Sequence, residues 1–265
     1  MIKVDDMPVE ETEKELVKDE VEDDSVEVKP KVKNPRRGVY LLPNLFTTAA
    51  LFSGFYSIIA AMNGNYTHAA IAIFISMVFD GLDGRVARLT RTQSAFGAEY
   101  DSLADMVSFG VAPALVSFTW ALDPLGKVGW IAAFIYVVGA ALRLARFNTM
   151  IGIEDKRYFT GLPSPAAAAI VAGVIWASNH AGLTGEQLAS VMALLVPVTG
   201  LLMVSNVKYR SFKDLNLKGR VPFVFLLIAV LILVLVALEP ALVLAAAFCA
   251  YGLWGILGIV FKQLR

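Results

Sequence analysis

The amino-acid sequence predicts an all-α protein: a polytopic membrane bundle of about eight transmembrane helices preceded by a disordered N-terminal tail. The 265-residue chain is 57% hydrophobic and its mean hydropathy is +0.64. A value this high over a whole chain is typical of a protein that crosses the bilayer several times. The charges are unevenly placed, because residues 1–37 contain 12 of the 23 acidic residues and 8 of the 23 basic ones.

Residues 1–37 form the predicted tail, and residues 38–265 form the predicted transmembrane domain. The tail has no aromatic residue and few large apolar ones, so it cannot bury enough surface to fold alone. It also lacks the apolar core of a signal peptide. Its end, residues 29–37, is basic and suits contact with anionic headgroups.

Eight apolar runs follow the tail, each near the length that a bilayer requires. They lie at residues 44–63, 66–88, 96–121, 128–148, 163–181, 187–205, 221–238 and 241–261. Only Glu239 and Pro240 separate the last two runs, and Pro240 favours a tight turn there. The single cysteine, Cys249, lies in the last run, so we expect neither an intramolecular disulfide nor a cysteine zinc site.

The positions of lysine and arginine predict the orientation. If the tail is cytoplasmic, 22 of the 23 basic residues fall on the inner side and only Lys127 falls outside. Because inner segments of membrane proteins are enriched in these residues, we expect both termini to be cytoplasmic. The same orientation puts an acidic stretch, residues 80–105, on the cytoplasmic side.

This acidic stretch reads DGLDGRVARLTRTQSAFGAEYDSLAD and carries the main functional signal. Helical geometry places Asp80 and Asp83 near one face of a helix, and Asp101 and Asp105 on one face of the next. Four carboxylates meeting in or near a membrane are costly unless cations compensate them. Oxygen ligands without histidine or cysteine favour Mg²⁺ or Mn²⁺.

The spacing resembles the signature of the CDP-alcohol phosphotransferases, D-x-x-D-G-x-x-A-R-x8-G-x3-D-x3-D, at every fixed position. The resemblance implies a two-metal site, with Asp105 as both ligand and catalytic proton acceptor; the implied metal ligands are Asp80, Asp83, Asp101 and Asp105. It also implies contacts to the CDP moiety from Asn44, Thr47, Gly84, Arg88 and Ser94. For Asn44 a structural interpretation stays open, as the N-cap of the first span.

Further segments resemble the membrane-embedded phosphatidylserine synthases of this family. They are PNLFTTAALFSGFYS after residue 42, ALRLARFN at residues 141–148 with the following GLPSP, and VSNVKYRSFK from residue 204. The resemblance implies transfer of a phosphatidyl group from CDP-diacylglycerol to L-serine, with CMP as the other product. Membrane lipids are the implied surroundings, and a homodimer the implied assembly.

Arg143 and Arg146 lie three residues apart on one face of a predicted helix, near its inner end. They are candidates for binding the acceptor anion, or they extend to the lipid phosphate layer. The signature concerns only the CDP part that all substrates of the family share, so glycerol 3-phosphate or inositol remains an alternative acceptor. A different class also remains open, a cation-coupled transporter whose carboxylates pair with Arg85 and Arg88.

Overall fold

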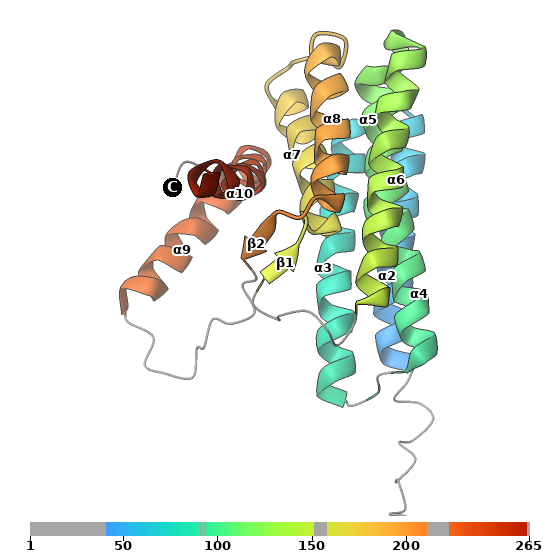
Figure 1. Ribbon diagram of the computed structural model, residues 1–265. Coiled ribbons are helices and arrows are strands. Elements are labelled where there is room, and N and C mark those ends of the chain that lie inside the picture. The colour runs from blue at the N-terminus through green and yellow to red at the C-terminus, as the bar shows by residue number, and fades with distance from the viewer. Residues whose placement is uncertain (1–40, 91, 93, 151–157, 211–222, 264–265) are drawn as a thin grey trace, which may run out of the picture. The chain divides into compact units, whose positions relative to one another are not determined.

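The computed structural model describes residues 41–90, 92, 94–150, 158–210 and 223–263 (Figure 1). The predicted tail, residues 1–37, lies outside the described residues. Each of the eight apolar runs coincides with a helical segment whose ends are shifted by a few residues. The segments are α2 (Leu41–Met62), α3 (Tyr66–Thr90), Ala95–Leu125, α6 (Lys127–Thr149), α7 (Ser164–His180), α8 (Ala189–Val204), α9 (Phe223–Leu238) and α10 (Pro240–Gln263). The third of these begins with α4 (Ala95–Asp105) and ends with the short helix η3 (Asp123–Leu125).

Four of the described helical segments are long and apolar enough to cross a membrane: Leu42–Met62, Ala95–Leu125, Lys127–Thr149 and Pro240–Leu257. Two others, Ala189–Val204 and Val224–Leu238, are apolar but shorter. Helix α3 carries two aspartates and two arginines between residues 80 and 88, which lower its hydropathy, and α7 has only 17 residues. The chain is thus an integral membrane protein built from helices.

A two-stranded ribbon interrupts the all-α pattern, and the sequence did not predict it. Strand β1 (Tyr158–Thr160) pairs antiparallel with β2 (Lys208–Arg210). Next to it, the amide of Gly161 donates to the carbonyl of Val207 at 2.8 Å, and Gly161 has a φ of +83°, which glycine adopts readily. The ribbon pairs backbone groups of the segment just before α7 with those of the segment just after α8.

Helices α2 and α3 pack side by side (Figure 1). Buried serine hydroxyls on each helix donate to backbone carbonyls of the other. Ser53 donates to Ala72, Ser57 to Ala69 and Ser76 to Ala50, each at 2.8 Å. These bonds hold the two backbones at a close and constant separation.

The third helical segment contains two π-helical stretches, η1 (Met106–Val111) and η2 (Phe118–Leu122), on either side of α5 (Ala112–Ser117). Pro113 has no amide hydrogen, so it cannot donate to the carbonyl of Phe109 four residues earlier. The buried hydroxyl of Tyr136 in α6 donates to that carbonyl at 3.0 Å. This bond replaces the hydrogen bond that Pro113 cannot donate, and it joins the third segment to α6.

Glycines allow α6 and α8 to approach at backbone distance. A Cβ added to Gly139 would overlap the carbonyl group of Gly200, and one added to Gly200 would lie 2.7 Å from the Cα atom of Tyr136. Small residues at a helix crossing of this kind are typical of membrane proteins, where close van der Waals contact drives helix association.

Candidate active site

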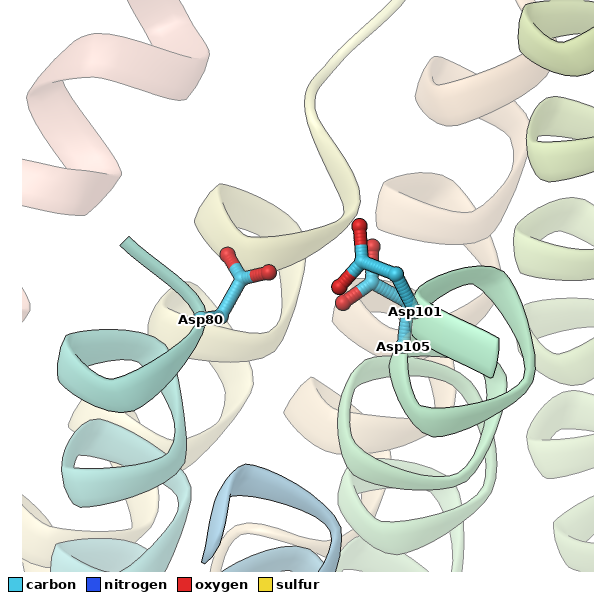
Figure 2. Close-up of side chains that lie close together, drawn as sticks. All are labelled: Asp80, Asp101 and Asp105. Carbon is cyan, nitrogen blue, oxygen red and sulfur yellow. The ribbon is translucent and has the colours of Figure 1, made fainter. Parts of the chain in front are cut away.

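Three carboxylates from two helices converge in the structure (Figure 2). Asp80 comes from α3, and Asp101 and Asp105 come from α4, one turn apart. One carboxylate oxygen of each lies within 4.8 Å of the others, and all three side chains are partly buried. In Figure 2, Asp80 points from its helix toward the other two carboxylates. This cluster has the donor atoms and spacing to hold a divalent metal ion.

Asp83 is placed differently from these three. It is 4% exposed and is the only charged residue among the buried residues that the structure describes. The hydroxyl of Thr47 in α2 donates to its Oδ2 atom at 2.8 Å. The sequence predicted one site with four aspartates. The structure brings three into a tight cluster and holds the fourth beside them with a hydrogen bond from a neighbouring helix.

A cavity of about 400 Å³ opens next to the carboxylates. All five residues that the resemblance assigns to the CDP moiety line it: Asn44, Thr47, Gly84, Arg88 and Ser94. Asp83 and Asp101 also line it. Asp101 therefore belongs to both the cavity and the carboxylate cluster, and the two form one site.

The cavity wall suits an anion. Ser94 caps α4 and accepts a hydrogen bond from the amide of Gly97 at 3.0 Å. Both residues line the cavity, so the N-terminus of α4, with its partial positive charge, faces the space that a phosphate would occupy. A Cβ added to Gly84 would meet nothing within 4 Å, so the bare backbone leaves room there for a ligand.

Two interpretations made from the sequence are not supported by the structure. Asn44 is not an N-cap, because the helix has already begun at Leu41 and the carbonyl of Asn44 accepts from the hydroxyl of Thr48 at 2.7 Å. The pairing that a transporter predicts is not seen either. Within the described part of the chain, no ion pair links the four aspartates to Arg85 or Arg88.

Arg143 and Arg146 line a small hollow with Phe147, Phe159 and Thr160. Arg143 donates to the buried hydroxyl of Ser164 at 2.8 Å, and Arg146 donates to Oδ1 of Asn206 at 3.1 Å. Phe147 lines both this hollow and the larger cavity. The arginines therefore lie in a space adjoining the one that the aspartates and the CDP-type residues share.

Three polar residues of the site were not singled out from the sequence. The amide of Asn148 donates to the hydroxyl of Ser102 at 3.1 Å, which joins α6 to the helix of Asp101. Asn206 holds Arg146 from the segment before β2. The available signal was an uncharged polar residue next to a candidate: Ser102 follows Asp101, and Asn148 ends the ALRLARFN segment.

Fold and site together define a helical membrane protein with a carboxylate cluster that could hold a divalent metal ion, beside a cavity whose wall suits an anion. The sequence matches the CDP-alcohol phosphatidyltransferase family over residues 40–204, and the chain belongs to this family.

Three named relatives are similar to this chain over more than half of its length. A CDP-diacylglycerol–serine O-phosphatidyltransferase of Helicobacter pylori strain J99 is 37% identical over 233 residues, which are 87% of this chain and 96% of that protein. One of the same name from Methanocaldococcus jannaschii is 37% identical over 182 residues, 68% of this chain and 80% of that protein. An archaetidylserine synthase of Methanothermobacter thermautotrophicus is 34% identical over 170 residues, 63% of this chain and 69% of that protein.

Proposed function

We propose that this protein is an integral-membrane phosphatidyltransferase that converts CDP-diacylglycerol and L-serine into phosphatidylserine and CMP. One observation carries the proposal: the five residues matching the CDP contacts of the family line a single cavity that meets the carboxylate cluster at Asp101. The names of the relatives support serine as the acceptor.

The metal site follows from the donor set. Asp80, Asp101 and Asp105 together with Asp83 would hold two divalent cations, Mg²⁺ or Mn²⁺, since the ligands are all carboxylate oxygens. When bound, the cations neutralise the pyrophosphate and stabilise the charge on the departing CMP. Arg88 and the N-terminus of α4 contribute further positive charge to the same phosphates.

Asp105 accepts the proton of the serine hydroxyl in this mechanism. The serine oxygen forms a bond to the phosphorus that carries diacylglycerol, and the bond from that phosphorus to the CMP oxygen breaks. The electron pair of the broken bond leaves with CMP. Asp105 lies one turn after Asp101, away from the N-terminal end of α4, where Ser94 and Gly97 line the cavity. The proton acceptor therefore lies apart from the end of α4 that lines the cavity for the nucleotide.

One of the two arginines, Arg143 or Arg146, binds the serine carboxylate in this proposal. Their hollow shares Phe147 with the CDP cavity, so an anion held there is next to the pyrophosphate. The contacts of Arg146 are to the neutral oxygens of Asn206 and Val204, which orient the guanidinium without cancelling its charge. An arginine that only extended to the lipid phosphate layer would have no need of this internal anchoring.

The arrangement in the membrane is part of the proposal. All eight helical segments cross the bilayer, with both termini and the carboxylates on the cytoplasmic side, where serine and CDP would have access. The distribution of Lys and Arg supports this topology. We also propose a homodimer, from family resemblance.

The decisive experiment measures CMP release from CDP-diacylglycerol by the purified enzyme in detergent, with serine, glycerol 3-phosphate or inositol as the added alcohol. We expect release to depend on serine. Release with another alcohol instead would keep the family chemistry and replace the acceptor. No release with any alcohol, together with cation flux in proteoliposomes, would favour the transporter.

A further inference from the structure

The contact between Thr47 and Asp83 has a consequence for the metal site. Thr47 is 3% exposed and Asp83 is 4% exposed, so water has little access to either side chain. A buried carboxylate is stable only with donors or cations around it, because desolvation of an isolated charge is costly. The hydroxyl of Thr47 supplies such a donor at 2.8 Å, across the interface of α2 and α3.

The single hydroxyl hydrogen of Thr47 is committed to this contact. A hydroxyl donates once, and its two possible acceptors are Oδ2 of Asp83 at 2.8 Å and the carbonyl of Pro43 at 3.2 Å. The carboxylate is both nearer and anionic, so it makes the stronger bond. The hydrogen is then not available to a phosphate or a ribose of the nucleotide.

The helix pair keeps Thr47 in place. The hydrogen bond from Ser53 to the carbonyl of Ala72 and that from Ser76 to the carbonyl of Ala50 join the same two helices further along. With both backbones fixed, the hydrogen bond from Thr47 to Oδ2 orients the carboxylate of Asp83.

We propose that Thr47 is a positioning residue for the metal ligand Asp83, its hydroxyl hydrogen serving that carboxylate rather than the nucleotide. The inference rests on the proposed metal site and assigns to Thr47 a role different from the one that family resemblance implies. A residue that orients a ligating side chain typically contributes 10- to 100-fold to metal affinity, and we expect about this loss when the hydroxyl is removed.

The test uses the full-length enzyme in detergent and Mn²⁺ alone, with free Mn²⁺ followed by electron paramagnetic resonance in the absence of nucleotide. Thr47→Val replaces the hydroxyl with a methyl of similar size, and we expect its Mn²⁺ dissociation constant to rise about 10- to 100-fold. Thr47→Ser keeps the hydroxyl and should bind Mn²⁺ nearly as the wild type does. Thr47→Ala provides a second variant without the hydroxyl if the valine variant does not fold.

Ser53→Ala is the matched control, because it removes another buried hydrogen bond between α2 and α3 away from the carboxylates. It should leave Mn²⁺ affinity unchanged. In an Asp83→Asn background, Thr47→Val should have no further effect on Mn²⁺ affinity.

Three results would overturn the inference. Normal Mn²⁺ binding by Thr47→Val with a raised KM for CDP-diacylglycerol would make Thr47 a nucleotide contact. An equal loss in Thr47→Val and Thr47→Ser would assign the effect to packing. If the wild type bound no Mn²⁺, the metal site itself would be wrong, and the role of Thr47 with it.

Discussion

Replacing Arg146 with glutamine should weaken serine binding while leaving CDP-diacylglycerol binding nearly intact. The side chain is partly buried, and its contacts are to neutral oxygens of Asn206 and Val204, so its charge remains available to a carboxylate. A charge-assisted pair in such a place contributes about 2–4 kcal/mol. Since each 1.4 kcal/mol is tenfold, KM for serine should rise about 30- to 1,000-fold.

The assay is CMP release with each substrate varied in turn, and Arg143→Gln is measured in the same way. Arg85→Gln is the control, because Arg85 is exposed on α3 and lines neither the cavity nor the hollow. Equal losses for serine and CDP-diacylglycerol in the Arg143 and Arg146 variants would indicate folding or lipid anchoring. An unchanged KM for serine in both would refute the acceptor site.

Three further predictions concern the metal, the helix packing and the third segment. EDTA should abolish CMP release, and adding Mg²⁺ or Mn²⁺ should restore it. The Asp101→Asn variant should retain little activity at any metal concentration. Full activity after exhaustive chelation would contradict the metal mechanism. Gly139→Ala should destabilise the protein by about 1–3 kcal/mol in a denaturation experiment, because the new methyl would overlap the backbone of α8. The control is Gly81→Ala, whose methyl would meet only open space and should leave the stability unchanged. Tyr136→Phe should lower the free energy of unfolding by about 1–3 kcal/mol, because it leaves the carbonyl of Phe109 without the hydroxyl that donates to it. An unchanged melting temperature would show that another group donates to this carbonyl.

Most of the helical architecture was predictable, since it follows from local apolar composition. The break between α9 and α10 at Glu239 falls where Pro240 predicted it, because proline excludes a continuous helix through that point. The β-ribbon was not predictable. Its strands are three residues each and lie far apart in the sequence, so their pairing depends on where α7 begins and α8 ends in space.

The carboxylate cluster was predictable for a different reason. The i to i+4 spacing places Asp101 and Asp105 on one helix face whatever the surroundings, and the structure confirms that Asp80 meets them. The hydrogen bond from Thr47 to Asp83 could not be derived in this way, because no local pattern encodes a contact between two helices across 36 residues.

The site divides into two halves built from different helices, and this division bears on acceptor choice. Helices α2, α3 and α4 provide the aspartates and the CDP-type cavity, whereas α6 and the start of α7 provide Arg143, Arg146 and Ser164. Contacts between the halves include Phe147, which lines both spaces, and the hydrogen bond between Asn148 and Ser102. If the proposed acceptor site is in this second half, a change there should alter the acceptor without disturbing the proposed metal ligands. Relatives that share the signature but use another alcohol should then differ most around Arg143 and Arg146, and Mn²⁺ affinity should be the same in the Arg146→Gln variant as in the wild type.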